Sequence, residues 1–354
     1  MTELGQLIAA RISRTGPITV ADFMADCLMH PTLGYYTTRD PFGAAGDFVT
    51  APEISQMFGE LLGLALAQCW LDAGRPSAFA LVELGPGRGT LMADLLRATL
   101  GVPGFHEAAR LHLIEGSPAL RERQAECLRA HGPCWHASFD DVPDLPLFLV
   151  ANEFFDALPI RQFVRDERGW RERMVAIEGS QLTFALGQPA AFAALDHRLA
   201  DTAENEFVET CAPAQGIAAS IAGRIARQGG AALLIDYGGW RSRGETLQAL
   251  RAHRPEPPLA SPGEADLTAH VDFEAIADAA RVAGAATTPM MTQGVLLERL
   301  GITPRAQALA RGLGGEAMRQ HVAAHRRLTH PDEMGSLVKA MAIHNGTPPP
   351  GFEL

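Results

Sequence analysis

The chain is poor in lysine and lacks paired cysteines and long apolar runs. Lys339 is the only lysine among 354 residues, so arginine carries nearly all of the positive charge. The five cysteines are scattered and form no C-x-x-C pair, so their spacing predicts neither a zinc site nor a redox motif. An odd number of scattered thiols indicates a reducing compartment. No segment reaches the roughly 20 apolar residues of a membrane span, and the N-terminus has no long apolar h-region. We therefore expect a cytoplasmic protein with no membrane insertion and no bound metal.

Charge and composition narrow the range of partners. The formal net charge is −11, so repulsion disfavours nucleic acid or an anionic membrane surface. Hydrophobic residues make up 47% of the chain, which is ample for a buried core. The length suits one large α/β domain, or one domain with a subdomain.

The middle of the sequence alternates between strand-like and helix-like patterns. Short apolar runs predict strands, and helical spacing predicts the helices between them, in the order 80–84, 90–100, 111–114, 118–131 and 145–151. The last run is almost continuously apolar, as expected for a strand buried on both faces. This alternation predicts an α/β, Rossmann-like fold with a parallel sheet covered by helices on both sides.

Other segments flank or interrupt this sheet. Residues 3–13 predict a first helix, and the T-x-x-D spacing of Thr19 and Asp22 predicts a capping box that starts a second one. Three β-like runs between 161 and 186 predict an inserted antiparallel meander, and the Gly/Pro-rich segment 238–266 predicts a flexible loop. We expect N-terminal helices and a substrate or lid loop over 1–78. The main domain follows over 79–354, with insertions near 160–190 and 238–330 and a helix-rich C-terminal part.

The stretch VELGPGRGT (82–90) joins the first predicted strand of the sheet to a helix. A glycine-rich turn at this place lets a ligand approach the backbone closely. The dinucleotide fingerprint G-x-G-x-x-G/A does not fit, because Thr90 holds the position of its third small residue, and the G-K-[ST] of a Walker loop is absent. A loop of this form suits S-adenosylmethionine, which has no phosphate. Its candidate cofactor-binding residues are Gly85, Pro86, Gly87, Gly89 and Thr90.

Acidic residues near the ends of successive predicted strands match the ammonium, ribose and adenine groups of this cofactor. Glu83 ends the first strand and can attract the cationic amino-acid end. Glu115 ends the second strand and can accept hydrogen bonds from both ribose hydroxyls. Asp140 and Asp141 precede the third strand, where a carboxylate often meets the adenine amino group; a solvated position is an equal alternative for these two.

Six blocks of the sequence resemble the MidA-like family of S-adenosylmethionine-dependent methyltransferases, the bacterial and mitochondrial relatives of an arginine-methylating assembly factor of complex I. The resemblance covers nearly the whole chain and is carried by HPTLGYY (30–36), GDFVTAPEISQMFGE (46–60), VELGPGRGTLMADLL (82–96), ANEFFDALP (151–159), LLIDYG (233–238) and GEADLTAHVDF (263–273). It implies a seven-stranded methyltransferase sheet and a protein substrate. For the mitochondrial relatives it implies symmetric dimethylarginine on the 49-kDa-type subunit of NADH:ubiquinone oxidoreductase (complex I). Whether the chain forms a homodimer stays open.

The acceptor site should contain carboxylates, because they can clamp a guanidinium bidentately and one of them can take its proton. Asn152 and Glu153 abruptly end the apolar strand 145–151 and are our main candidates, with Asp156 close behind. His270 is a candidate base, although a lone histidine is more often structural.

Residues before 60 are candidates for a substrate wall or lid. Tyr35 and Tyr36 are candidates for an apolar wall, and the alternative for both is ordinary packing. Asp47 and Glu53 flank the FVTAP stretch, and Glu53 could instead only favour the start of a helix.

Three further functions compete with protein arginine methylation. The same loop could serve a methyltransferase for a small molecule or another side chain. A non-catalytic assembly chaperone could bind the cofactor for stability alone, but the complete set of loop glycines and acidic residues argues against it. An NAD-dependent dehydrogenase fails on the glycine spacing.

Overall fold

The computed structural model describes residues 1–38 and 49–353. Its centre is a mixed sheet in which seven strands lie side by side in the order β15-β17-β10-β5-β2-β3-β4. Their bounds are β15 Ala286–Thr287, β17 Val338–His344, β10 Gly230–Gly239, β5 Leu147–Asn152, β2 Phe79–Leu84, β3 Ala109–Ile114 and β4 Cys134–His136. The strands from β10 to β4 pair in parallel, whereas β17 is antiparallel to β10. The short strands β14 (Val271–Asp272) and β16 (Met291–Thr292) pair with β10 and β17. The predicted α/β, Rossmann-like class is confirmed.

Alternate residues of the central strands enter two cores on opposite faces of the sheet. Phe148 and Val150 pack on one face with α5 (Gln56–Asp72) and α6 (Thr90–Thr99), while Leu147 and Leu149 pack on the other with α9 (Ala212–Gln228) and α10 (Phe273–Val282). All six residues of β5 are buried. The apolar run at 145–151 is therefore a strand covered on both faces, as predicted.

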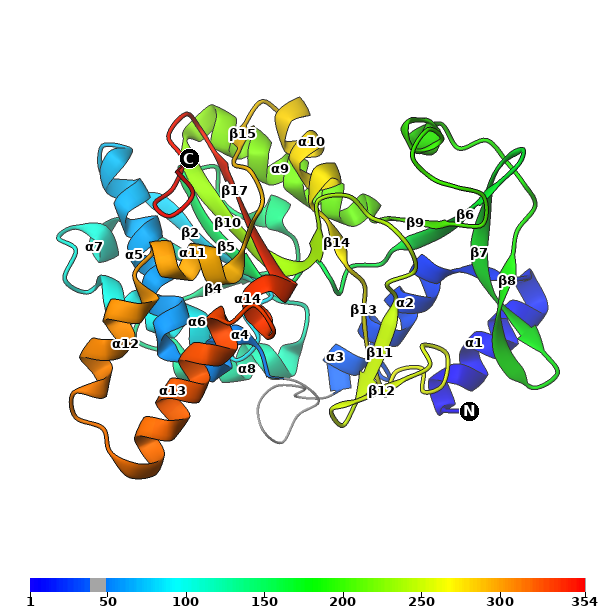
Figure 1. The fold of residues 1–354 in the computed structure, drawn as a ribbon, viewed down its shortest axis with the longest axis horizontal. Coiled ribbons are helices and arrows are strands. Elements are labelled where there is room, and N and C mark those ends of the chain that lie inside the picture. Colours follow the sequence, from blue (N-terminus) through cyan, green and yellow to red (C-terminus); the bar gives the residue numbers. More distant parts are fainter. Residues whose placement is uncertain (39–48, 354) are drawn as a thin grey trace.

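The predicted meander lies in a second sheet, apart from the central one. Strands β6 (Arg161–Asp166), β7 (Gly169–Glu178) and β8 (Gln181–Leu186) pair antiparallel and are joined by β1 (Ile18–Thr19) and β9 (Phe207–Thr210). Helices α1 (Glu3–Thr15) and α2 (Val20–Met29) pack against this sheet, and Thr19 and Asp22 form the predicted capping box at the start of α2. Figure 1 shows α1 beside β8, on the side of the molecule away from α12 and α13.

The segment 238–266 is not the flexible loop that its composition predicts. It contributes to a small antiparallel sheet of β11 (Gln248–Arg251), β12 (Arg254–Glu256) and β13 (Asp266–Thr268). Figure 1 shows this sheet between the central sheet and α1. The small sheet therefore stands where it can form one wall of a site at the carboxyl edge of the central strands.

The remaining elements are short or lie near the C-terminus. They are α3 Tyr35–Thr38, α4 Ala51–Ile54, α7 Phe105–Ala108, α8 Pro118–Cys127, η1 Phe139–Asp141, η2 Ala193–Arg198, α11 Gln293–Arg299, α12 Ile302–Ala310, α13 Gly315–Thr329 and α14 Met334–Leu337. Four of the last five elements before β17 are helices, so the predicted helix-rich C-terminal part is present.

Candidate active site

The glycine-rich loop makes a tight turn between β2 and α6. Gly85, Gly87 and Gly89 have φ angles of 60°, 54° and 83°, in the left-handed region that residues with a Cβ rarely adopt. A Cβ added at Gly85 would lie 2.9 Å from Cδ2 of Phe154, which is too close for a carbon–carbon contact. Glycine at 85 thus permits both the turn and the close approach of the segment after β5.

A cavity of about 590 Å³ opens at this loop. It lies at the carboxyl edge of the parallel strands, where open α/β sheets bind their ligands. Apolar side chains from strand ends and helices make much of its wall, and they include Leu84, Ile114, Leu120, Phe139, Phe154, Leu158 and Ile217. Its acidic lining residues are Glu115, Glu153, Asp156 and Asp266, and no Arg, Lys or His occurs among the described residues that line it. The cavity therefore favours a ligand with a large apolar part and positive charge.

A smaller hollow of about 40 Å³ shares Gly85, Gly87 and Glu153 with this cavity. Glu83 and Asn152 face it from the ends of β2 and β5. Glu83 Oε2 and Asn152 Oδ1 are buried and have no hydrogen-bond partner within the described part of the chain. Buried polar atoms normally have partners, so this pair of acceptors fits the ammonium end of S-adenosylmethionine.

Burial favours the neutral form of the Glu83 carboxyl group. Burial first, and then the nearby carboxylate of Glu115, raise the pKa of Glu83 to about 8. A cationic ligand would reverse this effect, because an opposite charge favours the ionised carboxylate.

Glu115 lies at the end of β3 and is fixed by two hydrogen bonds. Its Oε1 accepts from the Ser117 N–H at 2.8 Å, and its Oε2 accepts from Gln124 Nε2 at 3.1 Å. Gln124 also donates to the carbonyl of Gly87 at 2.7 Å, so it joins the glycine loop to the predicted ribose ligand. The sequence-based candidates omit Gln124, which gives no motif signal on a helix of ordinary composition. Burial raises the pKa of Glu115.

Glu153 combines an unusual backbone with a perturbed carboxyl group. Its φ angle is 50°, which is uncommon for a non-glycine residue and is typical of functional sites. Its Oε1 accepts from the Ala51 N–H and from Asn152 Nδ2, both at 3.2 Å. Burial raises its pKa to about 7.

Asp236 holds the turn that carries Glu153. Its Oδ2 accepts from the backbone N–H groups of Phe154 at 3.0 Å and Phe155 at 2.8 Å, and its Oδ1 accepts from the Tyr237 N–H at 2.8 Å. Burial raises the pKa of Asp236 to about 7. The sequence-based candidates omit Asp236 and Tyr237, although both belong to the LLIDYG block, and Tyr237 lines the cavity.

Asp156 faces the cavity from the same turn. Burial, and then the charges of Asp236, Glu153 and Asp266, raise its pKa well above the ordinary value. Tyr36 also lines the cavity and donates to Asp266 Oδ1 at 2.8 Å. Asp266 belongs to the polar block ADLTAHVDF that also holds His270, and it is Asp266 rather than His270 that lines the cavity.

The other candidates fall at the margin of the site or outside it. Thr90, Pro86 and Glu53 line the smaller hollow, and Thr90 Oγ1 donates to Glu53 Oε1 at 2.5 Å. Tyr35 is fully buried in the core with the N-terminal helices and does not line the cavity, so the expected wall is formed by Tyr36 alone.

Two aspartates and one histidine among the described candidates do not line the cavity. Asp140 and Asp141 are exposed, and their neighbours Ser138 and Phe139 line the cavity in their place. His270 is exposed on the far end of the ADLTAH segment, so the geometry does not bring it to the site as a base. Asp47 lies outside the described residues.

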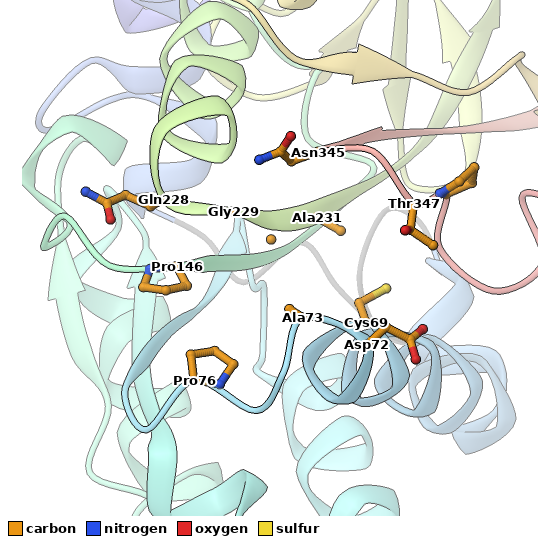
Figure 2. A pocket seen from close by; sticks show the side chains of 12 residues that line it. Cys69, Asp72, Ala73, Pro76, Pro146, Gln228, Gly229, Ala231, Asn345 and Thr347 are labelled. Atoms are coloured by element: carbon orange, nitrogen blue, oxygen red, sulfur yellow. The ribbon is translucent and has the colours of Figure 1, made fainter.

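A second cavity, of about 330 Å³, opens at the opposite edge of the sheet. Figure 2 shows its wall, with Pro146 and Gly229 before β5 and β10 and with Cys69 and Asp72 at the end of α5. None of its described lining residues is a site candidate. Its place at the amino ends of the parallel strands separates it from the glycine loop.

The described structure offers neither a metal cluster nor a membrane-spanning helix. No group of three or more His, Cys, Asp or Glu residues there could hold a metal ion. Within 1–38 and 49–353, none of the helices has both the length and the apolar character that a membrane crossing needs.

The strand order, the glycine loop after β2 and the acidic residues at the ends of β2, β3 and β5 together define a Rossmann-like methyltransferase. The family model described as "Putative S-adenosyl-L-methionine-dependent methyltransferase" matches residues 61–291. The "Protein arginine methyltransferase NDUFAF7, mitochondrial" of Danio rerio is 38% identical, over 96% of this chain and 86% of its own length. The protein of the same name from Homo sapiens is 37% identical, over 94% and 81%.

A solved structure agrees with this assignment. A protein from Burkholderia thailandensis, described as a "likely methyl transferase" and crystallised with S-adenosyl-homocysteine, matches with a TM-score of 0.83 and 30% identity, over 99% of this chain and 92% of that chain. The chain belongs to the MidA-like family of S-adenosylmethionine-dependent methyltransferases, as its sequence blocks predicted. Its cofactor is S-adenosylmethionine. The prediction of a cytoplasmic protein is wrong by the same comparison, because the relatives are named as mitochondrial proteins.

Proposed function

We propose that this methyltransferase is a protein arginine N-methyltransferase. One observation carries the proposal: the cavity at the glycine loop is lined by four carboxylates and, among its described lining residues, by no basic side chain. Such a wall attracts a cation, and several carboxylates together suit the planar, five-donor fork of a guanidinium. The names of the relatives from Danio rerio and Homo sapiens support an arginine acceptor on a protein.

Cofactor binding is assigned to the residues around the loop. Glu83 and Asn152 would hold the ammonium group with the buried oxygens that lack partners. Glu115 would bind the ribose hydroxyls, with Gln124 fixing its carboxylate beside the loop. The apolar wall near Phe139 would hold the adenine, and Asp140 and Asp141 would act there only through solvent at the rim.

Acceptor binding is assigned to the turn after β5. S-adenosylmethionine supplies a methyl group that its sulfonium already activates. Glu153 and Asp156 would hold the guanidinium and concentrate electron density on the nitrogen that takes the methyl group. That nitrogen gives up one proton when the new carbon–nitrogen bond forms. Glu153 would take this proton, because burial brings its pKa to about 7.

The finer parts of the proposal are the product and the target. We propose symmetric dimethylarginine as the product and a subunit of NADH:ubiquinone oxidoreductase, the 49-kDa-type subunit, as the target. The family resemblance supports both, and the target would connect the enzyme to complex I assembly.

The test is a labelling experiment. The purified protein is incubated with methyl-labelled S-adenosylmethionine and an extract of cells that lack it, the proteins are hydrolysed, and the labelled amino acid is identified. Label in symmetric dimethylarginine, lost in the Glu153→Ala variant, is the expected result. Label only in the small-molecule fraction would overturn the protein acceptor. Cofactor binding without any transfer would instead indicate an assembly chaperone.

A further inference from the structure

Part of the cavity wall beside the β5 turn comes from a segment of the chain that the proposed mechanism does not use. Gln248 and Leu250 on β11, and Asp266 and Thr268 on β13, all line the cavity. These strands pair antiparallel, with Gln248 opposite Thr268 and Leu250 opposite Asp266. The register therefore places one row of the small sheet on the cavity side.

Asp266 is the charged group of this row. Its side chain is buried, with the residue 5% exposed, and Oδ1 accepts a 2.8 Å hydrogen bond from the hydroxyl of Tyr36 on α3. The two residues are 230 positions apart in the chain. Tyr36 therefore sets the plane of the carboxylate from a separate element, as a rigid site requires.

Two walls of the same cavity thus carry carboxylates. Glu153 and Asp156 come from the turn after β5, and Asp266 comes from the small sheet. Asp266 lies near enough for its charge to help raise the pKa of both Glu153 and Asp156, after the larger effect of burial. Three carboxylates from two separate elements therefore gather at one cavity.

We infer that Asp266, positioned by Tyr36, binds the acceptor side chain together with Glu153 and Asp156, and that the small sheet is the acceptor-specificity element of the enzyme. The inference rests on the proposed function, because it takes the acceptor to be a guanidinium. Carboxylates from two separate elements can each accept from a different edge of a planar fork, whereas a lysine ammonium is a point charge. Asp266 is then a binding residue, and Tyr36 is a positioning residue that acts through it.

The test separates acceptor binding from cofactor binding. Initial rates of methyl transfer into protein arginine are measured over a dilution series of an extract from cells that lack the enzyme. Asp266→Asn should raise the half-saturating extract concentration at least tenfold. Tyr36→Phe should raise it by a smaller factor, about three- to tenfold, because the carboxylate remains but is less well oriented. The Kd for S-adenosyl-homocysteine and the Tm should stay near the wild-type values in both variants.

Asp332→Asn is the matched control, because its side chain is 87% exposed. If Asp266→Asn still labels arginine and its half-saturating extract concentration equals that of wild type, the inference is overturned. The proposed function is unaffected by that result. A loss of S-adenosyl-homocysteine affinity or of folding in both variants would also overturn it, because the pair would then be structural. No labelled arginine with the wild-type enzyme would overturn the proposed function itself.

Discussion

The backbone N–H of Ala51 donates a hydrogen bond to Oε1 of Glu153 at 3.2 Å, across 102 positions of the chain. Ala51 is the first residue of α4, where a helix leaves its N–H groups without internal partners. The start of this helix is thereby fastened to the turn that carries the proposed base. The same contact favours the ionised form of Glu153, against the larger opposing effect of burial.

Replacing Glu153 with Gln should slow methyl transfer by about 100-fold or more, the lower part of the range for a lost proton acceptor. The amide keeps the size of the side chain but cannot take the proton. The measurement is kcat at saturating cofactor, together with the Kd for S-adenosyl-homocysteine, which should change by less than about threefold. Glu178→Gln, at an exposed strand end, is the control. A kcat of Glu153→Gln within a few-fold of wild type would show that another group accepts the proton.

The pH dependence of kcat/KM should follow the ionisation of Glu153. Burial raises the pKa of Glu153 to about 7, so at lower pH this carboxyl is protonated and cannot act as acceptor. We expect kcat/KM for the protein acceptor to rise with pH through about 7, because this ratio follows the ionisation of the free enzyme. The rise should be absent in Glu153→Gln. A flat wild-type profile between pH 6 and 8 would remove Glu153 from this role.

Cofactor-site affinity should also depend on pH. Burial and then Glu115 raise the pKa of Glu83 to about 8, so the free protein holds a proton there at pH 7. An ammonium group pairs with the ionised form, and binding should therefore release up to one proton. The affinity for S-adenosyl-homocysteine should increase about tenfold or more between pH 6 and pH 8. Calorimetry in phosphate and in Tris buffer would detect the proton as a difference in apparent enthalpy.

Glu83→Gln should bind more weakly and lose most of this pH dependence. Glu122→Gln, on the exposed face of α8, is the control and should behave as wild type. Equal apparent enthalpies of wild type in the two buffers would show that Glu83 does not change its protonation on binding.

Gly85→Ala should damage both the fold and the site. The new methyl group meets a left-handed backbone, with φ of 60°, and lies 2.9 Å from Phe154. We expect a loss of about 1–3 kcal/mol in the free energy of unfolding and at least a tenfold loss of S-adenosyl-homocysteine affinity. Gly101→Ala is the control, because nothing lies within 4 Å of its added Cβ. Equal affinity in the two variants would contradict the close approach at Gly85.

The cofactor half of the site follows from local patterns in the sequence. Glu83, the loop glycines and Glu115 each end a strand or start a helix, so the alternation of strands and helices places them at one edge of the sheet. The family block at 82–96 contains Glu83 and the loop glycines, whereas Glu115 lies outside the blocks. The acceptor wall is different, because the hydrogen bond between Tyr36 and Asp266 joins residues 230 positions apart and no local pattern predicts it.

The sequence does not predict the small sheet, because the residues in its turn are unusual for a hairpin. Ala252 and His253 join β11 to β12 with φ angles of 50° and 59°, whereas two-residue hairpin turns of this kind usually contain Asn or Gly. Pro255 lies in β12, which pairs only with β11 at the edge of this sheet, where proline is tolerated. Strands of three or four residues add little periodicity. Composition alone therefore indicated a loop, and the strand assignment depends on tertiary packing.

Glu60 should support the stability of the fold without taking part in the reaction. Its side chain is 3% exposed and accepts from Arg97 at 2.6 Å and from Arg305 at 2.7 Å, so it joins α5 to α6 and α12. Burial alone would raise its pKa, but the hydrogen bonds from Arg305 and Arg97 lower the pKa overall. The Glu60 carboxylate therefore binds a proton more readily in the unfolded chain than in the folded protein. The stabilisation is present above the ordinary glutamate pKa and is lost as pH falls through the lowered value.

Glu60→Gln should reduce the free energy of unfolding by about 1–3 kcal/mol at pH 7, since it weakens charged hydrogen bonds to a buried group. The two arginines are 39% and 45% exposed and can turn to water, which keeps the loss below that of a fully buried pair. Urea unfolding at pH 7 and at pH 4 should show a smaller difference between variant and wild type at the lower pH. Glu316→Gln, which breaks an exposed pair with Arg319, should change stability by less than about 0.5 kcal/mol. A difference that stays constant from pH 7 to pH 4 would mean that the charge of Glu60 does not contribute.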